Sequence, residues 1–224
     1  MTGGFLATLL ATSSSEFSPK YNIAVETGML EHSDPHWDLI NSWHEPSAGL
    51  RFGYNLSPKI GVVTSYQGAT SSDTLRNNDD YDYESDYSSS LGDVDSRMKE
   101  HLITIGPKIN FTSKNWFVPY ATVQGLVAIG SLESGDNTWN KEEATTYFKD
   151  TSAGFGALGA LGVEIRTRPI SGKLQPIMYF EFGGGFSSAL NFSVPEIGVD
   201  GADMPIGDLK YGGQHFRFGL GTQF

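Results

Sequence analysis

The sequence predicts an all-β protein, an eight-stranded antiparallel up-and-down barrel formed by residues 19–224. Two observations predict this fold. Eight segments alternate between apolar and polar residues with the period of two that marks a β-strand. The connections between these segments are alternately short and long. A chain of 224 residues is long enough for one such domain, and the lack of cysteine excludes a disulfide scaffold and a thiolate metal site.

The first seven alternating segments each approach the roughly 9–11 residues that a tilted strand needs to cross a bilayer. They are residues 21–27, 48–56, 60–67, 103–111, 119–129, 154–166 and 178–186. In chain order, their apolar faces include Tyr21, Ile23 and Val25; Leu50, Phe52 and Tyr54; Ile60, Val62 and Tyr66; Ile103, Ile105 and Ile109; Val123, Val127 and Ile129; Phe155, Leu161 and Val163; and Met178, Phe180 and Phe182. Pro107 and Pro119 each remove a hydrogen-bond donor from a strand, so we expect a bulge near the short turn between the fourth and fifth segments.

The eighth segment is residues 212–224, which read GGQHFRFGLGTQF. Its apolar face carries Phe216, Phe218, Leu220 and the terminal Phe224, whereas Arg217 belongs to the polar face. The period of two predicts an amphipathic strand that ends in an aromatic residue.

The connections predict which ends of the strands lie together. Residues 57–58, 112–115 and 169–175 form short connections, and residues 30–46, 69–99, 131–152 and 187–211 form long ones. Strands joined tightly at one end and loosely at the other form an antiparallel meander with both termini at the tight end. Transmembrane barrels show this asymmetry, with short periplasmic turns and longer extracellular loops.

Residues 21–224 resemble the family of small eight-stranded bacterial outer-membrane β-barrels that includes the OmpA membrane domain, OmpX and OmpW. The resemblance rests on the last strand and on the stretches 105–108 (IGPK) and 118–121 (VPYA). It implies a location in the bacterial outer membrane, contact with outer-membrane lipid and lipopolysaccharide, and recognition of the strand ending in Phe224 by the barrel-insertion machinery. The resemblance does not extend to the peptidoglycan-binding domain of full-length OmpA, so it does not imply wall anchoring.

Aromatic residues near the ends of the apolar faces are typical of the girdles that flank a membrane-spanning band. They are Tyr21, Tyr54, Phe111, Trp116, Phe186 and Phe224.

The polar faces carry charges that are nearly balanced, although the whole chain has a net charge of −11. The charged residues are Glu26, Arg51, Lys108, Glu164, Arg166, Glu181 and Arg217. An eight-stranded barrel has an interior only just wide enough for side chains, and a buried charge without a partner is costly. We therefore predict that these seven residues form a structural ion-pair network that plugs the lumen, rather than a path for ions.

Residues 1–18 are expected to be a signal-peptide remnant or a flexible arm, because a short apolar run is followed by small residues but no basic residue precedes it. The acidic balance of the chain argues against a nucleic-acid partner.

Two groups of residues suggest other chemistry without establishing it. Asp79, Asp80, Asp82, Glu84 and Asp86 could offer oxygen ligands to Ca²⁺, but their spacing lacks the EF-hand pattern, so we interpret them as a solvated acidic loop. For an enzyme that modifies lipid A, His215 oriented by Glu26 is a candidate pair, and His32, His36 and His44 offer a candidate metal site. No nucleophile accompanies them, so neither catalysis nor a metal or cofactor is predicted.

The function predicted from the sequence is a structural or adhesion-like role at the cell surface. The alternatives are a narrow OmpW-like channel for small molecules, a barrel enzyme acting on lipid A, and a soluble lipocalin-like carrier with an apolar interior. The partner of the long loops is not specified by the sequence.

Overall fold

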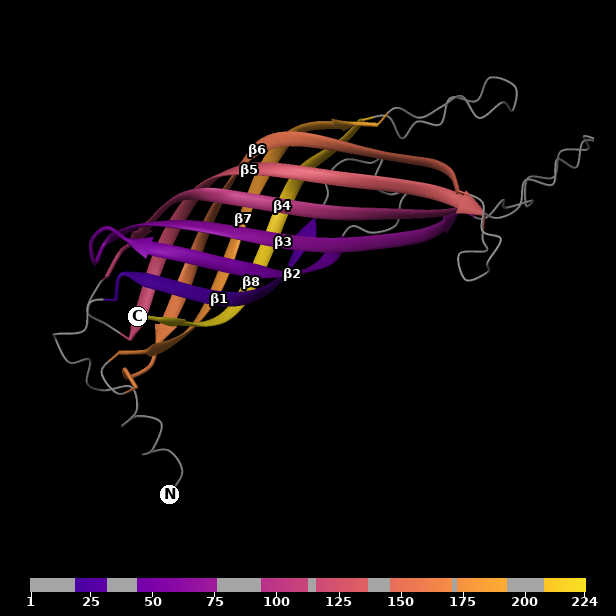
Figure 1. Cartoon of the computed structure of the whole chain (residues 1–224). Helices are drawn as coiled ribbons and strands as arrows, with labels where there is room; N and C mark the ends of the chain where they lie inside the picture. The colour runs from indigo at the N-terminus through magenta and orange to yellow at the C-terminus, as the bar shows by residue number, and fades with distance from the viewer. Residues whose placement is uncertain are drawn as a thin grey trace, which may run out of the picture.

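The computed structural model describes residues 19–31, 44–75, 94–112, 116–136, 146–170, 173–192 and 208–224. These residues form eight antiparallel strands in one sheet (Figure 1). The strands are β1 (Tyr21–Glu31), β2 (His44–Asn55), β3 (Ile60–Leu75), β4 (Val94–Asn110), β5 (Phe117–Asp136), β6 (Thr146–Arg166), β7 (Gln175–Asn191) and β8 (Asp208–Gln223). Each strand pairs with its neighbours in the sequence, and β8 pairs with β1, so the sheet is a closed barrel. The predicted fold is confirmed.

The barrel closes where the two ends of the sheet meet. Asn22 lies opposite Gln223 in the β1–β8 ladder, and Leu30 lies opposite His215. The ladder continues past β8, because the amide of Phe224 donates to the carbonyl of Tyr21 at 2.9 Å and the amide of Tyr21 donates back at 2.9 Å. Within the closed part of the barrel every strand is paired on both sides, whereas residues 70–75 of β3 pair only with β4 and residues 146–155 of β6 pair only with β5.

The strand ends that flank the short connections, residues 56–59, 111–116 and 167–174, lie at one end of the barrel, and the predicted up-and-down arrangement is confirmed. The other connections, residues 32–43, 76–93, 137–145 and 193–207, fall outside the described residues, as do the acidic segment 79–87 and residues 1–18. Within the described residues, no helix is long and apolar enough to cross a membrane.

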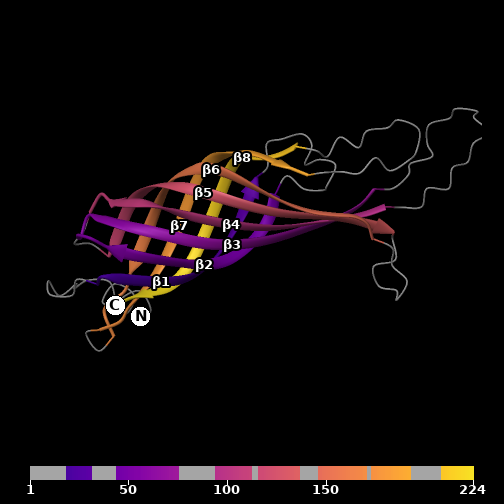
Figure 2. The ribbon, with the colours of Figure 1, turned by 45° about the horizontal axis from the view of Figure 1, so that its top comes forward.

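The strands are longer than the sequence predicts. β5 has 20 residues and β6 has 21, and both continue past the alternating segments toward the long connections. Figure 2 shows β3, β4, β5 and β6 extending beyond the rest of the barrel at that end. The added residues were missed because outward positions such as Thr70, Lys99 and Thr151 are polar there, which removes the apolar alternation while the hydrogen-bond ladder continues.

The two prolines do not produce the expected bulge. Ile105 pairs with Gly125 and Lys108 pairs with Thr122, so the register between β4 and β5 is the same on both sides of Pro107. The ladder is interrupted at Pro107 and then resumes without an extra residue. The register shifts instead between Ser134 and Gly135 in β5 and between Phe186 and Ala189 in β7.

The outer surface of the barrel is apolar and the inner surface is largely polar. Val123 is 64% exposed, Phe155 is 69% exposed and Leu161 is 65% exposed, whereas Glu164 and Arg217 on the same barrel wall are buried inside. Large apolar side chains exposed on every strand would be costly in water but favourable against lipid. A soluble carrier requires the opposite arrangement, with apolar side chains inside. The barrel is therefore of the membrane-spanning type.

The expected aromatic girdle residues lie on the outer surface. Tyr21, Tyr54 and Phe224 are 40–51% exposed and cluster at the short-turn end, with ring centroids 5.2 Å apart for Tyr21 and Tyr54 and 5.9 Å apart for Tyr21 and Phe224. Trp116 is exposed near the same end. Aromatic rings at the edge of an apolar band are suited to the boundary between lipid and water.

Candidate functional site

The lumen of the barrel contains all seven charged residues that the sequence placed on the polar face. Six of them are buried: Glu26 on β1, Arg51 on β2, Lys108 on β4, Glu164 on β6, Glu181 on β7 and Arg217 on β8. Arg166, near the end of β6, is half-buried. The period of two in each strand directs these side chains inward, and the register of the closed sheet decides which of them meet.

Glu181 is the centre of the first group of contacts. Its Oε2 accepts a hydrogen bond from Nη1 of Arg51 at 2.8 Å, and its Oε1 accepts one from Nη1 of Arg217 at 3.2 Å. The hydroxyl of Tyr120 donates to Oε2 of the same carboxylate at 3.2 Å. Nη1 of Arg217 also lies 3.4 Å from Oε1 of Gln124. One carboxylate thus joins side chains from β2, β5, β7 and β8.

Glu164 is the centre of the second group, closer to the short-turn end. Nζ of Lys108 donates to Oε2 of Glu164 at 2.5 Å, and Nε of Arg166 donates to Oε1 at 2.6 Å. Nε2 of Gln223 also donates to Oε1 at 2.5 Å. The carboxylate of Glu164 is therefore compensated by two cations and an amide, which is what a buried charge requires.

Two tyrosines connect these groups to each other and to Glu26. The hydroxyl of Tyr179 donates to Oε2 of Glu26, the one predicted network residue that is held by a tyrosine rather than by a cation among the described contacts. The guanidinium of Arg51 lies 4.6 Å from the ring centroid of Tyr179 and 5.8 Å from that of Tyr120. Nζ of Lys108 lies 4.3 Å from the ring centroid of Tyr120, within the range of a cation–π contact.

The sequence predicted no role for Tyr120 and Tyr179. Each of these tyrosines lies directly opposite a glycine, Gly162 for Tyr120 and Gly219 for Tyr179. Because the residue that faces each tyrosine depends on the register of the strands, the sequence offered no signal for this arrangement.

The lumen also contains an apolar layer, which the sequence did not predict. It consists of Met98, Leu102, Leu126, Ala128, Leu132, Leu158, Leu190 and Phe192. These buried side chains come from β4, β5, β6, the end of β7 and the residue directly after it, and most lie nearer the long connections than the ion pairs do. The lumen therefore has a charged region toward the short turns and an apolar region toward the long connections.

The candidate pair of His215 and Glu26 does not form. In the β1–β8 register Glu26 lies opposite Gly219, whereas His215 lies opposite Leu30, four residues further along β1. Nε2 of His215 instead lies 3.8 Å from Oε1 of Glu181, which exceeds hydrogen-bond distance. The expectation failed because two inward residues on adjacent strands meet only when the register brings them level.

The other metal-site candidates lie outside the part of the chain that the structure describes. His32 and His36 belong to residues 32–43, and only the backbone of His44 is described, at the start of β2. Among the described residues, no group of three or more His, Asp or Glu side chains is arranged to hold a metal ion.

Comparisons with known proteins give structural likenesses and no sequence match. No family model and no curated protein matches the chain. The attachment invasion locus protein Ail of Yersinia pestis, crystallised with the heparin analogue sucrose octasulfate, is similar to 91% of this chain over 95% of its own length, with 10% identity and a TM-score of 0.41. The outer membrane protein OprG from Pseudomonas aeruginosa is similar to 92% of this chain over 96% of its own length, with 11% identity and a TM-score of 0.47.

Acinetobacter baumannii CarO is similar to 94% of this chain over 100% of its own length, with 10% identity and a TM-score of 0.39. Because all three TM-scores are below 0.5, the assignment of the fold rests on the register and surface of the barrel itself. That register closes eight antiparallel strands, and that surface is apolar outside and charged inside. The chain has the architecture of a small outer-membrane β-barrel.

Proposed function

We propose that the chain is a bacterial outer-membrane protein whose barrel is a closed, rigid support for long connections that meet partners at the cell surface. Its role is structural or adhesive, and catalysis is not part of it. The main support for a closed lumen is the position of Glu181. Its carboxylate accepts hydrogen bonds from arginines on β2 and β8 and from a tyrosine on β5.

The contacts support a plug because they join strands that are not neighbours. Arg51 on β2 and Glu181 on β7 are separated by β1 and β8 around the barrel, so their ion pair crosses the interior. Lys108 on β4 and Glu164 on β6 are bridged in the same way across β5. Side chains that span the lumen leave little space for a continuous water column, and the apolar layer extends the filling toward the long connections.

Electrical recording on the protein in planar lipid bilayers tests the plug. The unmodified protein is expected to show no steady ion conductance. Combined Arg51→Ala, Glu181→Ala and Arg217→Ala substitutions remove the first group of contacts without leaving an unpaired charge from it, and conductance is expected to appear. The matched control is the ion pair of Glu133 and Lys149 outside the lumen, 3.6 Å apart, where the double change to alanine should leave the barrel closed. Steady conductance of the unmodified protein would overturn the plug.

A narrow channel is the second candidate, and one observation favours it. Both amide atoms of Gln67 and both ring nitrogens of His215 are buried and form no hydrogen bond with the described residues. Buried polar atoms of this kind commonly bind water. If they line a continuous path, the unmodified protein will conduct in the same recordings.

Placement in the outer membrane has its own test. Unboiled protein extracted in detergent should migrate faster on a gel than boiled protein, because a closed barrel resists unfolding by detergent. Extraction without detergent and a single mobility would contradict a membrane barrel.

Recognition of residues 212–224 by the insertion machinery is part of this proposal. The test compares the outer-membrane yield of a Phe224→Ser variant with that of a Phe186→Ser variant.

The surface role is tested by replacing the long connections one at a time with short glycine–serine turns. Cells that produce each variant are compared for attachment to host-cell monolayers. Loss of attachment with an intact heat-modifiable barrel would support a role for that connection. Equal attachment of all variants and of cells lacking the protein would exclude adhesion.

A further inference from the structure

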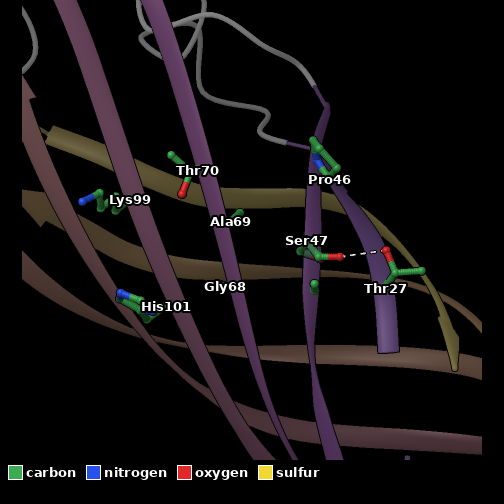
Figure 3. A pocket seen from close by; sticks show the side chains of 9 residues that line it. Thr27, Pro46, Ser47, Gly68, Ala69, Thr70, Lys99 and His101 are labelled. Atoms are coloured by element: carbon green, nitrogen blue, oxygen red, sulfur yellow. Dashed lines mark hydrogen bonds between the residues drawn. The ribbon is translucent and has the colours of Figure 1, made fainter. Parts of the chain in front are cut away.

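The outer wall of the barrel contains a groove with a volume of about 450 Å³ across β1, β2, β3 and β4 (Figure 3). Ala48 on β2 pairs with Gly68 on β3, which in turn pairs with His101 on β4. At the next outward-facing positions toward the short turns, the same strands carry Leu50, Tyr66 and Ile103. Because Ala48 carries only a methyl group and Gly68 has no side chain, a recess remains beside this row of larger side chains.

The groove lies where the outer surface of β4 changes from apolar to basic. From the short-turn end, the outward residues Ile109, Ile105 and Ile103 are at least 42% exposed and apolar. His101 and Lys99 follow and are also exposed, and both line the groove. Phosphate groups of membrane lipids lie at such a boundary between hydrocarbon and water, whereas acyl chains lie on its apolar side.

Lys99 and His101 are available to an anion. No described carboxylate forms an ion pair with Lys99, and the same holds for His101. The hydroxyl of Tyr66 and Nδ1 of His101 are 2.8 Å apart, and the two rings stack with centroids 5.8 Å apart. This contact fixes the imidazole against β3 and leaves Nε2 for another partner.

We propose that this groove binds a phosphate-bearing membrane lipid, with an acyl chain over Ala48 and Gly68 and the phosphate at Lys99 and His101. The proposal requires only that the barrel spans a membrane, and it is independent of the plug and of what the long connections bind. The occupant is a lipid rather than free phosphate, because the recess beside Lys99 and His101 is lined largely by small uncharged residues.

Native mass spectrometry of the full-length protein in detergent tests the proposal, with titration of phosphatidic acid, phosphatidylcholine or inorganic phosphate. The unmodified protein is expected to bind the first phosphatidic acid more tightly than phosphatidylcholine. Lys99→Gln should weaken that binding about fivefold, since one lysine near an anionic membrane surface contributes about that factor. Lys59→Gln is the matched control, because Lys59 is an exposed lysine at the short-turn end.

Gly68→Leu tests the groove separately from the charge. A Cβ at Gly68 meets its nearest neighbours, the carbonyl oxygen of Glu100, Nδ1 of His101 and the hydroxyl of Tyr66, at 3.7–3.9 Å, so the backbone accepts a side chain there. The leucine should fill the recess and weaken binding of both lipids, and Ala48→Leu is the second variant if Gly68→Leu does not give a heat-modifiable barrel. The proposal is overturned if Lys99→Gln combined with His101→Gln binds phosphatidic acid as the unmodified protein does, if the filled groove binds as before, or if inorganic phosphate competes with the lipid.

Discussion

Gly219 of β8 lies directly opposite Tyr179 of β7, and the tyrosine ring occupies the space where a side chain of residue 219 would be. A Cβ added at Gly219 would come within 2.3 Å of Cε1 of Tyr179. The same ring faces Arg51, and its hydroxyl donates to Glu26. The position of one glycine thus determines where three polar side chains of the lumen lie.

Gly219→Ala is therefore expected to displace the ring of Tyr179 and to destabilise the barrel by about 1–3 kcal/mol, the usual cost of overpacking a filled interior. Gly125→Ala is the control, because a Cβ there meets only the carbonyl oxygen of Ile105 at 3.8 Å. The temperature at which the fast-migrating gel band is lost measures both variants. Equal temperatures would show that the ring does not depend on Gly219.

Glu181→Gln is expected to be among the most destabilising single changes in the lumen. It leaves the buried guanidinium groups of Arg51 and Arg217 without their carboxylate, and removing one partner of a buried ion pair costs about 3–5 kcal/mol. The control is Glu133→Gln, whose partner Lys149 is 61% exposed, and the expected cost there is about 0–1 kcal/mol. Unfolding in urea, followed by circular dichroism in detergent, gives both values. Similar midpoints for the two variants would contradict the central place of Glu181.

The apolar layer of the lumen predicts a contrast between two leucines. Leu132 is 2% exposed inside the barrel and Leu161 is 65% exposed outside it. Leu132→Ala should lower the free energy of unfolding by about 2–5 kcal/mol because it leaves a cavity. Leu161→Ala leaves no cavity and should have a much smaller effect in the same urea measurement. A larger loss for Leu161→Ala would mean that the layer is not packed as described.

The outer surface predicts a dependence on depth in the membrane. Val123 lies in the middle of the apolar outward run of β5, and Val123→Arg should cost about 2–4 kcal/mol in a lipid bilayer. Thr151→Arg, at an exposed outward position of β6 nearer the long connections, should cost about 0–1 kcal/mol. Folding into vesicles of phosphatidylcholine measures both. Equal costs would place the boundary of the membrane elsewhere on the barrel.

Much of the fold could be predicted because a period of two is a local property of the chain. Alternation placed Glu164 and Arg217 on one face and Leu161 and Phe218 on the other. The nearly balanced charges and the narrow interior of an eight-stranded barrel then predicted that the charged face is the lumen, and the lengths of the connections predicted the up-and-down order. Where Leu126 and Leu158 face inward, both faces of the strand are apolar, so alternation gives no sign of the apolar layer.

Contacts between distant residues could not be predicted, because they depend on register. The hydroxyl of Tyr179 reaches Glu26 across 153 residues of sequence, and a shift of the β1–β8 ladder would bring a different residue to that carboxylate. The same dependence explains why Glu26 and His215 were considered as a pair although the register separates them. The effect of Pro107 also depended on both strands, since the β4–β5 ladder keeps its register past the missing donor.

Because the strands differ in length, the two sides of the barrel differ in height at the end that carries the long connections. β1 has 11 residues and β6 has 21, and ten residues of strand correspond to about 33 Å. At that end β3, β4, β5 and β6 therefore extend beyond the rest of the barrel on one side, and β1 and β2 end earlier on the other side. Neighbouring proteins would consequently meet two different surfaces, depending on how the barrel is rotated about the membrane normal.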